Sequence, residues 1–253
     1  MSSIRKAKQI FAAALEAAKP EKAMRRFVRP SLAHEFPRLY IDDRKYDMRN
    51  FDKVMVVGAG KATVNMLTGL LQVYPTTRES SKDELTAASS FPPIYGKIIT
   101  KYDHYSEQAR KLINISMQRQ RECFDMTSSA DAVSDLKMEV DEAGHPIPDE
   151  CGLSSTREIL HMANLADART LVITLISGGG SSLLVSPVES VSLQVCPQNL
   201  ASKSAPSRIN LFCLLLCCAT PGACENESVI DGMWSRHSGN KRGAKVYISS
   251  KRR

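Results

Sequence analysis

Two glycine-rich turns hold the residues of this sequence that are best suited to bind an anion. The first is Gly58-Ala59-Gly60-Lys61, and the second is Ser177-Gly178-Gly179-Gly180-Ser181-Ser182. Glycine has no Cβ, so the backbone N–H groups of such a turn can approach a ligand closely, and serine hydroxyls add further donors. Lys61 adds a positive charge. The two turns together predict a phosphate-binding site.

Neither turn fits the common nucleotide-binding signatures. A dinucleotide fingerprint needs a third glycine where this chain has Thr63, whereas a P-loop needs glycine in place of Met55 and serine or threonine in place of Ala62. Each turn alone is more often an ordinary tight connection between a strand and a helix than a binding site. The occurrence of two such turns in one chain, one of them with a lysine, is what favours phosphate binding.

The elements that must position these turns can be predicted from the apolar pattern. Each turn follows an apolar run typical of a buried strand, and helical patterns follow at Val64–Val73 and from Ser181 onward. A helix that begins at such a turn directs free N–H groups and its dipole toward the same point. Further strands are predicted at Gly96–Thr100 and Leu136–Val140, with helices at 105–121 and 155–166.

This alternation predicts an α/β fold, a Rossmann-like and mostly parallel sheet with helices on both faces, followed by an irregular C-terminal tail. Ser155-Thr156-Arg157-Glu158 has the pattern of a capping box that opens the helix at 155–166. Arg25–Tyr46, rich in arginine and with two prolines, is expected to be a connection over the surface. Ile4, Ala7, Phe11, Ala14, Leu15 and Ala18 recur at helical spacing before Pro20, which predicts an N-terminal helix.

Four more candidates follow the predicted second and third strands. Lys101 and His104 come directly after Gly96–Thr100, at the strand end where ligands bind in open α/β sheets. His145 and Asp149 lie on a loop that Pro146 and Pro148 make rigid. That stiffness suits a binding site and a structural hinge equally well.

Composition bounds the remaining possibilities. The 253 residues carry a net charge of +7, but the excess of positive charge is local. Residues 194–253 hold nine basic and three acidic side chains, whereas residues 1–193 hold 25 basic and 24 acidic side chains. Seven cysteines without C-x-x-C spacing favour free thiols. No apolar run is long enough to span a membrane, no motif for nucleic-acid binding occurs, and no signal peptide is recognisable, so the expected location is the cytoplasm.

Four motifs, taken in order, resemble those of the glycerate kinases that have an N-terminal nucleotide-type domain and a C-terminal domain of the MOFRL type. They are Val56–Ala62, Thr100–Tyr102 with His104, Glu142–Asp149 and Leu175–Leu184. The resemblance extends from about the first helix to Leu193. It implies an N-terminal α/β domain at residues 1–193 and a divergent basic tail at residues 194–253.

The resemblance implies ATP-dependent phosphorylation of D-glycerate to a phosphoglycerate, with Mg²⁺ as cofactor. It implies a catalytic role for Lys61, whose charge would balance that of the transferred phosphoryl group. It also implies two groups of binding residues. Nucleotide or phosphate would be bound by Gly58, Gly60, Ser177, Gly178, Gly179, Gly180, Ser181 and Ser182, and the substrate cleft would contain Lys101, His104, His145 and Asp149.

The tail departs from that family's pattern after about Gln194, where the second domain would follow. This suggests a truncated or alternatively spliced product with reduced or no activity, or a mispredicted gene model, whose tail does not belong to the fold. The alternative is a non-catalytic fragment that binds nucleotide or the full-length kinase. A homo-oligomer, which could complete the cleft with a second chain, is also possible. The sequence does not indicate which hydroxyl of glycerate is phosphorylated.

Overall fold

The central sheet of the protein is visible in a computed structural model, which describes residues 3–31, 36–75, 91–125, 137–187 and 245–249. Its strand order is β6-β5-β4-β7-β8. The strands are β4 (Lys53–Ala59), β5 (Ile94–Lys101), β6 (Met138–Ala143), β7 (Thr170–Ile176) and β8 (Lys245–Ser249). The first four run parallel to one another, and β8 pairs antiparallel with β7.

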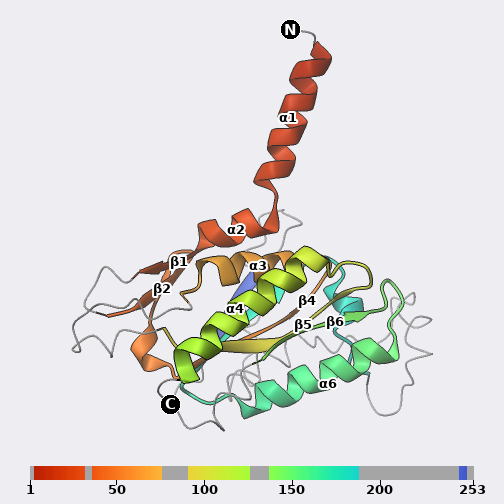
Figure 1. Ribbon diagram of the computed structural model, residues 1–253. Coiled ribbons are helices and arrows are strands. Elements are labelled where there is room, and N and C mark those ends of the chain that lie inside the picture. Colours follow the sequence, from red (N-terminus) through yellow and green to blue (C-terminus); the bar gives the residue numbers. More distant parts are fainter. Residues whose placement is uncertain (1–2, 32–35, 76–90, 126–136, 188–244, 250–253) are drawn as a thin grey trace, which may run out of the picture.

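Helices cover both faces of this sheet (Figure 1). Alternate residues of β4 point to opposite faces. Val54 and Val56 therefore pack in one apolar cluster with α3 (Thr63–Val73) and α4 (Glu107–Asp125), whereas Met55 and Val57 pack in a second cluster with α6 (Glu150–Leu165). The predicted α/β fold with a mostly parallel sheet is confirmed.

The segment before the sheet differs from its prediction. Instead of a surface connection, Arg25–Tyr46 holds the end of α2 (Pro20–Phe27) and most of an antiparallel sheet of β1 (Val28–Ser31), β2 (Arg38–Ile41) and β3 (Arg44–Asp47). A single 3-10 turn, Met48–Asn50, leads from β3 toward β4. The prediction was wrong because Val28, Leu39 and Ile41, spread among charged residues, are buried in the same cluster as α3.

The start of α6 is also corrected. The helix begins at Glu150, and Asp149 caps it by accepting a hydrogen bond from the Gly152 N–H at 2.9 Å. The predicted capping box at Ser155 lies inside the helix, because Ser155 is buried and donates to the Asp141 carboxylate at 2.5 Å. An earlier Asp at the end of a proline-containing loop therefore outcompetes the later Ser-x-x-Glu pattern.

A buried lysine connects α6 to strands β5 and β6 of the sheet. The Lys97 side chain on β5 is 6% exposed and pairs with Glu139 and Asp141 of β6 and with Glu158 of α6. Burial opposes the charged form, but the hydrogen bonds that Lys97 donates to these carboxylates outweigh it and raise the pKa of Lys97. Its charge is therefore fully compensated within the fold, which indicates a structural role.

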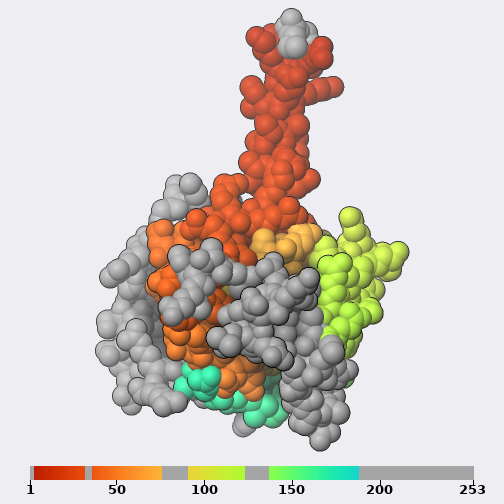
Figure 2. Space-filling model, turned by 60° about the vertical axis from the view of Figure 1, so that its left-hand side comes forward, coloured from red at the N-terminus to blue at the C-terminus, as the bar shows by residue number. Residues whose placement is uncertain are grey.

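Two further elements lie at the periphery. Helix α1 (Ser3–Ala17) agrees with the predicted N-terminal helix, stands away from the body and has no buried residue (Figures 1 and 2). Strand β8 is the described part of residues 194–253, where the sequence analysis expects no strand. The prediction of free thiols cannot be followed at the cysteines of residues 196–224, which lie outside the described residues.

No helix among the described residues reaches the length and apolarity that crossing a membrane would take.

Candidate functional site

The two glycine turns meet at the carboxyl ends of neighbouring strands. β4 pairs with β7 along its whole length, from Lys53 opposite Thr170 to Ala59 opposite Ile176. The chain leaves β4 through α3 toward β5 on one side, and it returns to β7 through α6 on the other face. Such a reversal of strand order leaves a crevice beyond the strand ends, which is the usual ligand site of an open α/β sheet.

Hydrogen bonds hold the two turns together. The Lys61 N–H donates to the Gly178 carbonyl at 2.9 Å, and the Ser177 N–H donates to the Ala59 carbonyl at 3.2 Å. The Ser177 hydroxyl, which is nearly buried, accepts from the Ala62 N–H at 2.9 Å. Ser177 was predicted to bind phosphate; in the structure its hydroxyl joins the second turn to the start of α3.

Glycine is required at two of these positions. Gly60 has φ +142°, and a Cβ there would lie 2.1 Å from the Ser177 hydroxyl oxygen. Gly179 has φ +93°, and a Cβ there would lie 2.8 Å from His145 Nε2 and 3.4 Å from Lys61 Cε. The two short distances from Gly179 show that the His145 ring and the Lys61 side chain both approach the second turn.

Basic side chains gather around the turns. Lys61 is exposed, and its carbonyl lies 3.2 Å from His104 Nδ1. Burial and the charge of Lys61, with smaller contributions from Lys101 and His104, lower the pKa of His145. Lys61, Lys101, His104 and His145, which were predicted separately from the sequence, are thus close enough to interact electrostatically. Their combined field favours an anion.

The carboxylates beside this basic group are already engaged. Asp149 caps α6 and also accepts from the Tyr102 hydroxyl at 2.7 Å. Burial would raise the pKa of Asp149, but the hydrogen bonds from Gly152 and Tyr102 outweigh it and lower this pKa. Asp149 was predicted as a residue of the substrate cleft. In the structure both of its carboxylate oxygens accept hydrogen bonds that fix the loop.

Glu142 was not singled out by the sequence analysis as a site residue. One oxygen of its carboxylate accepts from the N–H groups of His104 and Tyr105, each at 3.2 Å. It thereby fixes the turn after β5 that carries His104. The strand β6 extends to Ala143, three residues beyond its predicted end, which is why Glu142 reaches this turn. Its acidic type, next to a predicted strand end, was the available signal.

The remaining predicted residues have varied environments. Gly58 lies inside β4, where a Cβ would be 2.1 Å from the Leu175 carbonyl oxygen, so this glycine serves strand packing. Gly178 is exposed, with open space where a Cβ would be. Gly180, Ser181 and Ser182 form part of the single-turn helix α7 (Gly180–Leu183), in which the Ser182 hydroxyl donates to the Gly179 carbonyl at 3.0 Å.

Comparisons with known proteins show what this chain is similar to. Residues 6–203 match the family described as "Domain of unknown function (DUF4147)". A "D-glycerate 2-kinase" of Thermotoga maritima is 29% identical over 145 residues, which are 57% of this chain and 25% of that protein. A "Glycerate 2-kinase" of Pyrococcus horikoshii is 47% identical over 58 residues, which are 23% of this chain and 13% of that protein.

A relative from Agrobacterium vitis has a different name, "Putative hydroxypyruvate reductase". It is 29% identical over 141 residues, which are 56% of this chain and 23% of that protein. The chain thus spans about a quarter or less of the length of the curated relatives it matches.

A solved structure supports the fold. The PH0495 protein of Pyrococcus horikoshii superposes with a TM-score of 0.51 and 24% identity over 77% of this chain and 33% of that one.

Proposed function

This chain belongs to the DUF4147 family, the N-terminal domain of glycerate kinases, and from that premise we propose that its glycine-turn crevice binds the phosphates of ATP next to D-glycerate. The reaction would be ATP-dependent phosphorylation of D-glycerate to a phosphoglycerate. Both ligands are anionic. The crevice would therefore have to bind two negatively charged groups close together.

The observation that carries the proposal is the gathering of Lys61, Lys101, His104 and His145 around two glycine turns at the switch point of the sheet. Among the described residues, neither lysine forms an ion pair with a carboxylate. Like charges held together without a counter-charge disfavour the folded protein, and an anionic ligand would relieve that repulsion.

Each residue would contribute through position or charge. Phosphoryl transfer depends mainly on aligning the reactants and on neutralising the oxygens that carry negative charge. Lys61, the exposed residue of the first turn, would bind the transferred group. Ser177 would hold the two turns at a fixed separation, and His104 and His145 would donate hydrogen bonds to the carboxylate or to phosphate oxygens.

Bound ATP would supply the phosphoryl group, but the described residues do not by themselves form a site for Mg²⁺. No group of three or more His, Cys, Asp or Glu side chains in the described ranges could hold a metal ion. Beside the turns, both oxygens of Asp149 and one oxygen of Glu142 already accept hydrogen bonds from backbone and tyrosine donors. We therefore derive no step through a metal ion.

The same carboxylates favour an alternative function. A kinase needs a group that accepts the proton of the substrate hydroxyl. Both oxygens of Asp149 and one oxygen of Glu142 already accept hydrogen bonds, which weakens the case for either carboxylate as this base. The alternative is a non-catalytic nucleotide-binding chain, or a partner of a full-length kinase.

Calorimetric titration of the purified chain with ATP and Mg²⁺, followed by an assay of ADP release with D-glycerate, tests both functions. Binding with turnover supports the kinase, and binding without turnover supports the alternative. Oxidation of NADH with hydroxypyruvate would instead favour the activity named for the Agrobacterium vitis relative. Absence of any ATP binding would contradict the proposal.

Two variants locate the binding. Lys61→Ala should weaken the binding of ATP roughly 10- to 100-fold. Lys111→Ala is the matched control, because Lys111 is a 72% exposed lysine on α4, a helix away from the turns. An equal loss in both variants would mean that ATP binds through general charge and not at the crevice.

A further inference from the structure

Helix α1 presents an apolar face that nothing in the described part of the chain covers. Ile4, Ile10, Phe11 and Leu15 are 70%, 71%, 65% and 56% exposed. Figures 1 and 2 show the helix projecting from the body, which it joins near the start of α2. A single 15-residue helix is only marginally stable in water, since most helix stability comes from packing of the apolar face. We therefore expect this apolar face to pack against another surface.

The spacing of this face matches a helix pair. Ile4, Ala7, Phe11 and Ala14 follow one another at intervals of three, four and three residues. This is the a/d pattern of a two-stranded coiled coil, in which each such side chain packs between residues of the facing helix. Ile10 and Leu15 flank this stripe and widen it.

The sizes of the side chains favour an antiparallel pair. When two copies run in opposite directions, Ile4 can lie opposite Ala14 of the second copy and Phe11 opposite Ala7, so that every large side chain meets a small one. In a parallel pair each residue meets its own equivalent. Two crowded layers, Ile4 with Ile4 and Phe11 with Phe11, would then alternate with two hollow alanine layers, and both crowding and voids are unfavourable.

Charge favours the same direction. Arg5, Lys6 and Lys8 lie in the first half of α1, while its only acidic residue, Glu16, lies in the last turn. A parallel pair would bring six basic side chains to one end. An antiparallel pair separates them and places Arg5 and Lys6 near the carboxyl end of the other helix, where the dipole attracts positive charge.

We propose that α1 pairs with α1 of a second copy of this chain, antiparallel, through Ile4, Ala7, Phe11 and Ala14. The antiparallel direction also suits the shape of the molecule, because the free tip of each helix points away from its own body (Figure 2). The proposal is independent of the activity proposed above. It gives a physical basis to the homo-oligomer that the sequence analysis considers.

Sedimentation equilibrium of the full chain over a range of concentrations is the first test. We expect a monomer–dimer equilibrium, and Phe11→Glu should weaken it roughly 100- to 10,000-fold, because each dimer loses two buried aromatic side chains. Leu165→Glu is the matched control, because Leu165 is 67% exposed on α6 and should leave the dimer unchanged. Leu15→Glu repeats the test at the edge of the stripe.

The direction of the pair is tested by charge exchange. Ile4→Lys and Ala14→Glu should each weaken the dimer. In the antiparallel pair, a chain that carries both changes places Lys opposite Glu twice, so the double variant should dimerise more tightly than either single variant. In a parallel pair it would place like charges opposite each other and dimerise least.

Three results would overturn the proposal. The first is a chain that stays monomeric at every concentration. If hydrogen exchange also shows α1 to be protected in that monomer, another part of the same chain covers the helix, and the proposal fails as well. The second is a dimer that Phe11→Glu and Leu15→Glu leave unchanged. The third is a double variant weaker than both single variants. Because no residue of α1 is buried, these changes are not expected to unfold the body.

Discussion

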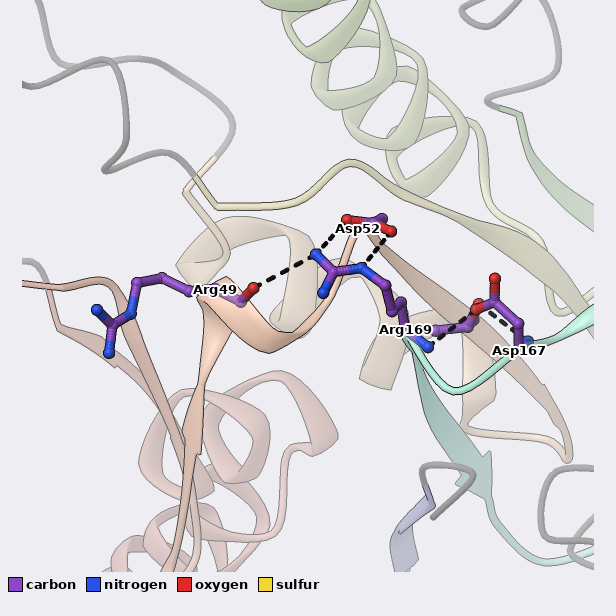
Figure 3. Close-up of polar contacts among 5 residues, drawn as sticks. Arg49, Asp52, Asp167 and Arg169 are labelled. Carbon is purple, nitrogen blue, oxygen red and sulfur yellow. Dashed lines mark hydrogen bonds and ion pairs between the residues drawn. The ribbon is translucent and has the colours of Figure 1, made fainter. Parts of the chain in front are cut away.

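The two ends of the β4–β7 pair differ in how their charges are balanced. At the amino ends, Arg169 donates to both oxygens of Asp52, at 2.5 and 2.6 Å, and Asp167 accepts from the Thr170 hydroxyl at 2.7 Å (Figure 3). At the carboxyl ends, Lys61 and Lys101 form no ion pair with any described carboxylate, and they lower the pKa of His145. One end is neutralised within the chain, and the other is not.

This difference separates stability from ligand binding. A charge that has its partner in the fold needs no ligand, whereas positive groups gathered without one are stabilised when an anion arrives. Active sites generally hold such unfavourable arrangements at the expense of stability. The four predictions below change one end at a time and follow both properties.

The largest effect on stability is expected from Gly60→Ala. Both the positive φ and the 2.1 Å approach of a Cβ to the Ser177 hydroxyl oppose a side chain at this position. We expect the free energy of unfolding in urea to fall by about 2–3 kcal/mol.

Gly178→Ala is the control, because nothing lies within 4 Å of a Cβ at Gly178. It should change the free energy of unfolding by less than about 0.5 kcal/mol. Equal effects in the two variants would show that the turns are not packed together as described.

Lys61→Ala should act on binding and not on stability. A hydrogen bond to a charged group contributes about 1.5–3 kcal/mol, so affinity for inorganic phosphate or ATP should fall roughly 10- to 100-fold. The urea midpoint should stay unchanged or rise slightly, since a like charge is removed near His145. A marked fall in the midpoint would instead assign Lys61 a structural role.

The sequence predicted the sheet better than the segments around it. Runs such as Leu171–Ile176 are apolar on both faces, so their burial can be inferred without knowing their neighbours. The strands β1–β3 could not be found in this way. Their apolar residues, Val28, Leu39 and Ile41, are separated by charged ones, and they become core only because α3 lies against them.

The site was predicted in its composition but not in its contacts. Glycine turns and basic residues at strand ends are visible in the sequence, and the topology brings them together. By contrast, Glu142 depends on β6 extending to Ala143, and Ser177 depends on the register between β4 and β7. Such tertiary hydrogen bonds leave no local pattern.

His145 gives a pH dependence of smaller size. The pKa of His145 is lowered in the folded chain, so the imidazole is protonated more readily in the unfolded chain as the pH falls below about 6.5. Acid therefore removes the part of the free energy of unfolding that comes from the neutral His145. His145→Asn should remove that part, whereas His161→Asn, on exposed α6 surface, should not.

Phosphate should raise the His145 pKa in an NMR titration, because it neutralises the nearby lysines. A His145 pKa that phosphate does not move would show that the anion binds elsewhere.

The smallest effect is expected at the paired end, from Asp52→Asn. Asp52 and Arg169 are 59% and 45% exposed, so solvent screens their pair, and its loss should cost less than about 1 kcal/mol.

The hydrogen bond from Arg169 lowers the pKa of Asp52, so the contribution of this ion pair to stability is present above about pH 4 and is lost as the pH falls below it. The difference between wild type and variant in urea should therefore shrink as the pH falls below about 4, and 1 M NaCl should reduce it at pH 7. Asp43→Asn, an exposed aspartate that makes no ion pair among the described residues, is the control. Phosphate affinity should be the same in all three proteins, because the changed charge lies at the opposite end of the strands; a weaker affinity in Asp52→Asn alone would mean that the paired end sets the geometry of the turns.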